Sequence, residues 1–237
     1  MLTVRHVKKT YAQGGVVDAS IDLRRGEIVG LVGPGGSGKT TLFEMIAGSL
    51  RPDAGEIMLD GSDVTMLPMF ERARRGIGYL VQDPSLFRGL TVEQNILMAL
   101  ETLPLDRAAR KVTLDRLLRR FRLDHLGNQI GSKLSGGERR RAEIVRAIAS
   151  RPNLLLLDEP FAGVDPIAVQ ELHSVIKAIR DNGVGVLITD HNVREILSLG
   201  SRIYVIENGR VVHHASPDRI ASHPYLRRTF LGEGFKA

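Results

Sequence analysis

The stretch that decides the fold is Gly33-Pro34-Gly35-Gly36-Ser37-Gly38-Lys39-Thr40. It matches the spacing G-x-x-x-x-G-K-[ST], and it lies between an apolar run at residues 27–32 and a plausible helix at residues 41–47. Glycines allow the backbone to wrap closely around a phosphate with its N–H groups pointing inward, and the helix adds the positive end of its dipole. An ordinary glycine-rich turn would need neither the full spacing nor this context. We therefore predict that the loop holds the β- and γ-phosphates of a nucleotide.

Two side chains at the end of this loop carry specific chemistry. Lys39 would bring a mobile positive charge to the phosphates, and the Thr40 hydroxyl would coordinate Mg²⁺. Thr41 follows directly, and we count it with the loop among the nucleotide-binding residues. The loop thus predicts a nucleotide bound together with Mg²⁺.

A second apolar run ends in two adjacent carboxylates. Residues 154–157 are four leucines, and Asp158 and Glu159 follow them. Asp158 would hold Mg²⁺, commonly through water, and Glu159 would lie beside the γ-phosphate, where a carboxylate can orient and polarise the attacking water. A strand that merely ends at a solvated edge is the alternative. The phosphate loop upstream favours catalysis.

Short β-type runs alternate with segments of helical pattern along most of the chain. The runs lie at residues 27–32, 154–157, 184–189 and 202–206. Such alternation predicts an α/β fold with a mostly parallel sheet covered by helices. Asp60-Gly61 and Asn208-Gly209 predict tight hairpins, and so small antiparallel elements beside that sheet. Between residues 92 and 150 only helical spacing remains, as in Leu114, Leu117 and Leu118.

These patterns predict one domain with an inserted helical lobe. The catalytic core would comprise residues 1–86 and 151–237, the helical subdomain residues 87–150, and a C-terminal tail residues 223–237. A chain of 237 residues is long for one domain, but α/β folds of this size often remain one unit.

Composition narrows the class of protein. Hydrophobic residues make up 43% and charged residues 25%, as expected for a globular protein with a substantial core. With 0 Cys, disulfides, zinc modules and thiol catalysis are excluded. No apolar run approaches the roughly 18 to 20 residues that span a bilayer, and the first residues lack a signal-peptide pattern. We therefore expect a cytoplasmic protein without direct membrane insertion.

The net charge of +6 leaves two interpretations open. Basic clusters at residues 72–75, 116–122 and 139–141 could attract nucleic acid, or they could simply form a solvated surface. The basic residues are interspersed with acids, so we expect most of them to keep the surface soluble and expect no nucleic-acid partner.

The segment Leu134-Ser135-Gly136-Gly137-Glu138 precedes a helical run. Ser135 and Glu138 have the S-x-x-E spacing of a capping box, so helix initiation alone would explain them. Together with the phosphate loop, however, the segment resembles the signature of ABC ATPases. That resemblance covers essentially the whole chain. It implies a RecA-like P-loop NTPase fold and ATP hydrolysis with Mg²⁺.

The other motifs of that family occur in the family's order. Tyr11 resembles the aromatic residue that stacks on adenine, although a packing role is also open. Gln82 resembles the Q-loop glutamine, which would contact Mg²⁺ and the γ-phosphate region, and Asp165 matches the D-loop. His191 resembles the switch histidine that steadies the catalytic geometry. The resemblance thus implies Glu159, His191 and Gln82 as catalytic residues and Thr40, Gln82 and Asp158 as metal ligands.

The resemblance also implies partners. In the family two cassettes meet head to tail, so that the signature of one closes over the ATP held by the other, and we expect a homodimer. Because the chain has no membrane span, the permease would be a separate subunit. Phe87, Arg88 and Leu90 match the segment that contacts a permease in related transporters. A core position for Phe87 is the alternative.

Three segments narrow the resemblance further. Residues 76–80, 158–167 and 187–195 look very like the ATPases of the bacterial lipopolysaccharide-export system, and the ending at residues 230–235 fits them. This implies a homodimer on the cytoplasmic face of the inner membrane, beneath two different permeases, that powers lipopolysaccharide extraction toward the outer membrane. Asp83-Pro84-Ser85 reads more like importers. The ATPase of a branched-chain amino-acid importer and, from another class, a nucleic-acid-associated ABC ATPase therefore stay as alternatives.

Overall fold

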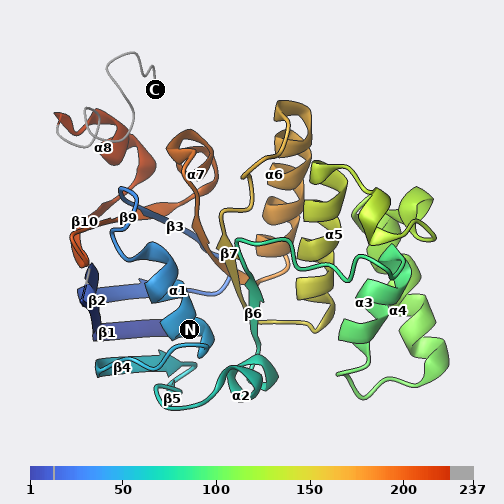
Figure 1. Ribbon diagram of the computed structural model, residues 1–237, viewed down its shortest axis with the longest axis horizontal. Coiled ribbons are helices and arrows are strands. Elements are labelled where there is room, and N and C mark those ends of the chain that lie inside the picture. The colour runs from blue at the N-terminus through green and yellow to red at the C-terminus, as the bar shows by residue number, and fades with distance from the viewer. Residues whose placement is uncertain (13, 225–237) are drawn as a thin grey trace.

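In the computed structural model, which describes residues 1–12 and 14–224, one sheet of ten strands has the order β5-β4-β1-β2-β10-β9-β3-β8-β7-β6 (Figure 1). Its strands are β1 (Leu2–Tyr11), β2 (Gly14–Leu23), β3 (Ile28–Val32), β4 (Ala54–Leu59), β5 (Ser62–Asp63), β6 (Ile77–Leu80), β7 (Leu154–Asp158), β8 (Gly185–Thr189), β9 (Arg202–Glu207) and β10 (Arg210–Ala215). The helices are α1 (Lys39–Ala47), α2 (Met69–Arg74), α3 (Val92–Leu100), α4 (Arg107–Arg120), η1 (Asp124–Leu126), η2 (Gly131–Lys133), α5 (Gly136–Ala149), α6 (Pro166–Arg180), α7 (Val193–Leu199) and α8 (Pro217–Ser222).

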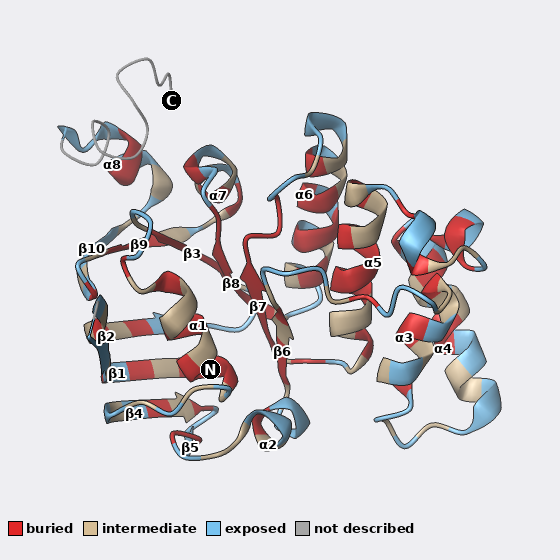
Figure 2. Cartoon of the chain, viewed as in Figure 1, coloured by how far each residue is buried: buried red, intermediate tan, exposed pale blue. Residues whose placement is uncertain are grey.

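The central part of the sheet is parallel, as the sequence predicts. Strands β9, β3, β8, β7 and β6 pair in parallel, and the four predicted β-type runs are β3, β7, β8 and β9. Every residue of β3, β7 and β8 is buried (Figure 2). Strands buried on both faces read as continuous apolar runs, which explains why the sequence revealed them.

The antiparallel part is larger than predicted. Asp60-Gly61 and Asn208-Gly209 do form tight turns, with φ of 48° and 80° at the first pair and 48° and 74° at the second. Their hairpins are β4 with β5 and β9 with β10. The long strands β1 and β2, however, escaped the sequence analysis. Only part of each is buried, and register shifts interrupt the alternation of apolar residues along β1.

Two apolar clusters lie on opposite faces of the sheet. In β7, Leu155 and Leu157 belong to the cluster that α3, α5 and α6 cover, whereas Leu154 and Leu156 belong to the cluster that α1 and β1 cover. Successive strand residues point to opposite faces, so one strand supplies both clusters. The phosphate loop and the two carboxylates therefore follow strands that are fixed from both sides.

The chain leaves the sheet after β6 and returns at β7, and α3, α4 and α5 lie in between, at one end of the molecule (Figure 1). Two capping boxes begin helices there. Ser135 and Glu138 form the box predicted at α5, and Thr91 with Gln94 forms a second at α3 that the sequence analysis did not name. No helix within residues 1–12 and 14–224 is long and apolar enough to span a bilayer. The ending at residues 230–235 lies outside the described part of the chain.

The predicted solvated surface for the basic clusters is wrong for three arginines. Arg72, Arg140 and Arg141 are only 0%, 6% and 7% exposed. Arg72 donates to the carbonyl oxygens of Met45 and Ile46, at 2.5 and 2.9 Å, and so satisfies the end of α1. Burial lowers the pKa of Arg72 to about 10. The charge pattern of the sequence cannot reveal this burial, because the acceptors are backbone carbonyl oxygens of residues distant in sequence.

Candidate active site

The phosphate loop spans the turn from β3 to α1. Gly38 is the N-cap of α1 and has φ of 102°, a conformation that glycine adopts without strain. A Cβ at Gly33 would lie 2.2 Å from the carbonyl oxygen of Ile206, so the loop packs directly on β9. Lys39 Nζ donates to the carbonyl oxygens of Gly33 and Pro34, each at 2.9 Å. The ammonium group is thus held over the loop in which phosphates would lie.

Asp158 ends β7 beneath this loop. Its side chain is fully buried, and its Oδ1 atom has no hydrogen-bond partner among the described residues. The Tyr79 hydroxyl donates to Oδ2 at 3.4 Å. Burial, together with the neighbouring Glu159 charge, raises the pKa of Asp158 to about 6. A buried carboxylate oxygen without a partner fits a hard cation or its water ligand, so Asp158 with Thr40 and Gln82 could hold Mg²⁺.

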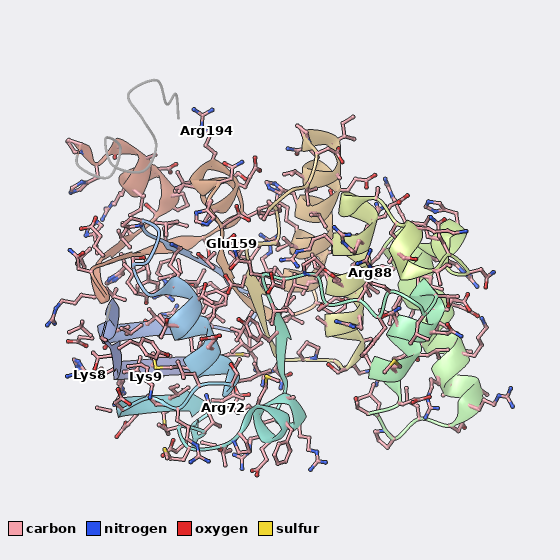
Figure 3. The ribbon with its side chains drawn as sticks, viewed as in Figure 1. Lys8, Lys9, Arg72, Arg88, Glu159 and Arg194 are labelled. Atoms are coloured by element: carbon pink, nitrogen blue, oxygen red, sulfur yellow. The ribbon has the colours of Figure 1, made fainter. Side chains whose placement is uncertain are left out.

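Glu159 lies near the middle of the molecule (Figure 3) and takes up a strained backbone conformation, with φ of 50°. Its N–H donates to the carbonyl oxygen of Thr189 at 2.8 Å, which ties the residue to the end of β8. The carboxylate accepts from Gln82 Nε2 at 2.9 Å, and its other oxygen lies 2.8 Å from His191 Nε2. The side chain is therefore fixed by a residue on each side.

A hollow of about 440 Å³, which we call the nucleotide hollow, brings most of the predicted nucleotide-site residues together. Its lining residues are Tyr11, Gly15, Gly35, Gly36, Gly38, Lys39, Thr40, Thr41, Gln82, Glu159 and His191. Sequence reasoning missed Gly15, which lies on β2 and reaches the loop because a Cβ on Gly38 would be 3.0 Å from its carbonyl oxygen. Tyr11 is half exposed at the mouth of the hollow, where an aromatic ring is accessible for stacking.

The predicted signature residues and Asp165 do not line this hollow. Ser135 is the N-cap of α5, where its N–H donates to Glu138 at 2.8 Å. Asp165 is the N-cap of α6 and accepts from the N–H groups of Ile167 and Ala168. A Cβ on Gly137 would lie 2.4 Å from the Ala168 side chain. The starts of α5 and α6 are therefore packed together, apart from the phosphate loop of the same chain.

Sequence reasoning also missed a buried ion pair that joins α5 to the backbone of Asp158 and Glu159. The Arg140 guanidinium donates to the carbonyl oxygens of Asp158 and Glu159 at 2.8 and 2.9 Å, and to that of Val81 at 3.0 Å. It also pairs with Glu143 at 3.1 Å, and Glu143 accepts from the N–H of Ser85 at 2.7 Å. The spacing of three between Arg140 and Glu143 is the one signal in the sequence that could have suggested this pair.

The segment after Gln82 presents side chains at the surface. Phe87 is 51% exposed, which excludes a core position for it in this chain. The Arg146 guanidinium lies 5.6 Å from the centre of the Phe87 ring and donates to the carbonyl oxygen of Ser85 at 2.8 Å. The carbonyl oxygen of Arg88 accepts from the N–H of Ser132 at 3.0 Å. Arg146 of α5 thus holds one side of the segment, and the Phe87 side chain on it is accessible to solvent.

Comparison with known proteins decides the family. A model of the family described as "ABC transporter" matches residues 16–162, which include the phosphate loop, Gln82, the signature and both carboxylates. This chain belongs to the ABC transporter family. It is therefore an ATP-binding subunit and an ATPase whose hydrolysis is coupled to transport.

Relatives in this family match the chain over its length. A "Lipopolysaccharide export system ATP-binding protein LptB" of Acidithiobacillus ferridurans is 48% identical over 100% of this chain and 98% of its own length. The LptB of Escherichia coli K12 is 46% identical over 99% and 98%. A "Probable ABC transporter ATP-binding protein" of Azorhizobium caulinodans is 53% identical over 96% of this chain and 82% of its own.

Solved structures of ABC cassettes share the fold. The ADP conformation of one ATP-binding cassette superposes with a TM-score of 0.86 at 25% identity, over 98% of this chain and 99% of the other. A dimeric bacterial ABC cassette superposes with a TM-score of 0.82 at 25% identity, over 92% and 99%. The ABC fold predicted from the sequence is confirmed.

Proposed function

We propose that this ABC subunit is the ATPase that powers export of lipopolysaccharide from the inner membrane. The support is the identity of 46–48%, over nearly the whole of both chains, to the LptB proteins of three organisms. The subunit would then act on the cytoplasmic face of that membrane, beneath two different permeases.

Glu159 would be the residue that activates water for hydrolysis. The observation that carries this role is the placement of its carboxylate between Gln82 and His191, with its oxygens 2.9 and 2.8 Å from their nitrogens, at the wall of the nucleotide hollow. A carboxylate fixed on both sides can orient one water molecule and accept its proton. His191 would hold the Glu159 carboxylate in that position, and Gln82 would contact the γ-phosphate region.

The phosphate loop would bind the triphosphate and its cation. Lys39 would leave the carbonyl oxygens of Gly33 and Pro34 and donate to phosphate oxygens instead, since a charged acceptor makes the stronger hydrogen bond. Asp158, Thr40 and Gln82 would hold Mg²⁺, which when bound neutralises charge on the phosphates. Tyr11 would stack on the adenine at the mouth of the hollow.

A second copy of the chain would complete the site. The segment Leu134–Glu138 leads into α5 and does not line the nucleotide hollow of its own chain. Its N–H groups would therefore bind a phosphate held by a partner. Residues 87–150 would move as a lobe with this segment. The head-to-tail homodimer would close on ATP and open when the γ-phosphate is lost.

The surface formed by Phe87, Arg88 and Leu90 would receive the permease. Exposed aromatic and arginine side chains are common anchors of interfaces. The same stretch is joined through Arg146 and Ser85 to α5, and through Gln82 to Glu159, so a movement of the permease could reach the catalytic residues.

The proposal is tested by purifying the Glu159→Gln variant with ATP from solubilised membranes and identifying the proteins retained. Two distinct permeases and a lipopolysaccharide-binding protein are the expected result. Phe87→Ala should lower their recovery several-fold, whereas Val212→Ala, an equally exposed apolar position on β10, should not. Recovery of amino-acid permeases would instead identify an importer, and recovery of nucleic acid alone would overturn the transporter assignment.

A further inference from the structure

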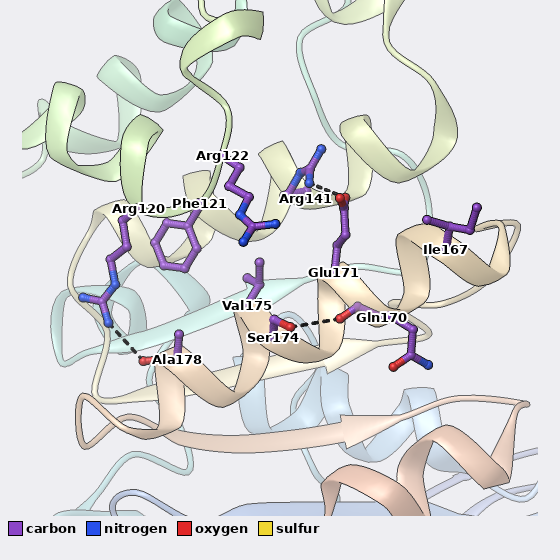
Figure 4. Close-up of a pocket in the computed structure, with 10 residues that line it drawn as sticks. All are labelled: Arg120, Phe121, Arg122, Arg141, Ile167, Gln170, Glu171, Ser174, Val175 and Ala178. Carbon is purple, nitrogen blue, oxygen red and sulfur yellow. Dashed lines mark hydrogen bonds and ion pairs between the residues drawn. The ribbon is translucent and has the colours of Figure 1, made fainter.

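A second hollow, of about 410 Å³, lies between the C-terminal end of α4, the helix α5 and the helix α6 (Figure 4). It shares no lining residue with the nucleotide hollow. Arg120, Arg122 and Arg141 line it, and Glu171 is the acidic residue among its lining residues. The lining thus carries a net charge of +2, in a region where residues 106–122 hold seven basic and two acidic side chains.

The charges of this hollow are only partly compensated. Arg141 is 7% exposed, and its guanidinium pairs with Glu171 (Figure 4). Arg120 donates to the side-chain oxygen of Asn182 at 3.1 Å and to the carbonyl oxygen of Ala178 at 3.3 Å. Those acceptors are neutral, so they fix the direction of the Arg120 guanidinium without neutralising it. Two positive charges therefore remain at the hollow.

Arg122 supplies the second of these charges from a strained backbone. It has φ of 54° just after α4, where the N–H of Leu123 donates to the carbonyl oxygen of Leu118 at 2.8 Å. This helix-ending motif favours glycine, and an L-residue there costs about 1 kcal/mol. The guanidinium has no hydrogen-bond or ion-pair partner among residues 1–12 and 14–224, and it points toward α6 above Val175 (Figure 4).

An apolar floor lies below these charges. Phe121 and Val175 line the hollow and are 4% and 7% exposed. The volume falls within the range of about 300 to 1,000 Å³ that is usual for small-molecule sites. Backbone strain often persists where a residue serves a binding site. The strain and the unpaired charge of Arg122, over an apolar floor, therefore favour a ligand-binding role for this residue.

We propose that this hollow binds a phosphomonoester carried on a small apolar body. A phosphomonoester bears a charge of about −1.5 to −2 at neutral pH, which matches the two uncompensated guanidinium groups. The planar guanidinium fork of Arg122 suits phosphate oxygens, and Arg120 adds positive charge at the edge of the hollow. Phe121 and Val175 would cover the apolar body. The ligand would bridge the end of α4 to α6. The phosphate could belong to a soluble molecule or to a lipid headgroup.

The test uses phenyl phosphate as the probe and the whole subunit saturated with ADP, so that the phosphate loop is already filled. Binding is measured by calorimetry, with inorganic phosphate as the second probe. Phenyl phosphate should bind more tightly than inorganic phosphate, because only the former covers the apolar floor. Arg122→Gly should weaken its binding about tenfold, as expected for loss of a charge-assisted pair.

Arg122→Gly also keeps the experiment interpretable, since glycine relieves the backbone strain and the variant should unfold at an equal or higher temperature. The matched control is Arg119→Ala, an exposed arginine three residues earlier, on α4, that does not line the hollow. Equal affinity of phenyl phosphate for both variants, or no binding in the presence of ADP, would overturn the proposal.

Vesicles separate the two sources of the phosphate. If cosedimentation with phosphatidate vesicles, but not with phosphatidylcholine vesicles, depends on Arg122, the ligand is a lipid headgroup. If soluble phenyl phosphate binds through Arg122 while neither vesicle does, the ligand is a soluble molecule. Both outcomes support the site.

Discussion

Two adjacent carboxylates, Asp158 and Glu159, differ in their surroundings although they are neighbours in sequence. Asp158 has an oxygen without a partner and a pKa raised to about 6, whereas both oxygens of Glu159 contact side-chain nitrogens. The first is suited to a cation and the second to a water molecule. The division of roles that the family resemblance implied therefore has a physical basis in burial and contact.

The ionised Asp158 carboxylate should lower the free energy of unfolding when no nucleotide or cation is bound. Because its pKa is raised from 3.8 to about 6 in the fold, this carboxyl favours the folded state at low pH, and that contribution is lost as pH rises through 6. Asp158→Asn should therefore be more stable than the parent protein at pH 8 by up to about 3 kcal/mol, and by less at pH 5. Urea unfolding in EDTA measures this, with Asp124→Asn at an exposed position as the control. A gain that does not grow with pH would contradict the assignment.

Residue identities could be predicted where a motif fixes them and not where packing does. Lys39 and Glu159 stand at motif positions, so the sequence alone predicted one site for them, and both line the same hollow. Arg140 stands inside a run of three arginines, and only the fold shows that this one meets the carbonyl oxygens of Asp158 and Glu159. Its acceptors are backbone atoms on another strand, which no local pattern records.

At the scale of elements, α5 connects the two parts of the proposed ATP site. Its N-cap, Ser135, belongs to the segment proposed to act on a partner's ATP. Arg140, in its second turn, donates to the carbonyl oxygen of Glu159 in its own chain. A rotation of α5 would therefore move the Ser135 segment and the backbone at Glu159 together.

The buried arginine of α5 should be essential to folding and activity. Arg140→Met leaves Glu143 buried without its charge partner and removes the donors that hold the turn at Glu159. A loss of about 3 to 5 kcal/mol in the free energy of unfolding is expected, with a lower rate of hydrolysis. Arg139→Met, at the partly exposed neighbour, should change stability by less than about 0.5 kcal/mol. Equal changes in stability and hydrolysis for the two substitutions would contradict the role of Arg140 in connecting α5 to the turn at Glu159.

Gly137, the second glycine of the signature, should be required for packing as well as for the proposed contact with ATP. A Cβ on Gly137 would lie 2.4 Å from the Ala168 side chain, so Gly137→Ala should lower the free energy of unfolding by about 1 to 3 kcal/mol. Helix propensity alone would give a gain of about 1 kcal/mol, so the sign of the change is decisive. Gly35→Ala, with no atom within 4 Å, is the control. Thermal unfolding of the nucleotide-free protein measures both variants.

For the molecule as a whole, the parallel strands were predictable because they are buried on both faces and read as apolar runs. The long strands β1 and β2 were not, since one side of each faces solvent and register shifts break the alternation. The two halves of the proposed ATP site were also predictable as motifs. Their separation within one chain is a property of the fold, and it is the reason we propose a second copy.

The dimer should form on ATP and depend on the signature. With Glu159→Gln to prevent hydrolysis, ATP should shift the protein from monomer to dimer in sedimentation velocity. Adding Ser135→Arg should abolish that shift by filling the space for the γ-phosphate, while nucleotide binding by the monomer is retained. Dimers that form equally well with Ser135→Arg would show that the signature does not close over ATP.

The most direct test of the central claim, that Glu159 held between Gln82 and His191 activates water, is single-turnover phosphate release by Glu159→Gln beside its ATP affinity. We expect unchanged ATP binding with hydrolysis slower by about 10² to 10⁴-fold, the usual contribution of a general base. A rate within a few-fold of the parent protein, at equal ATP occupancy, would contradict it.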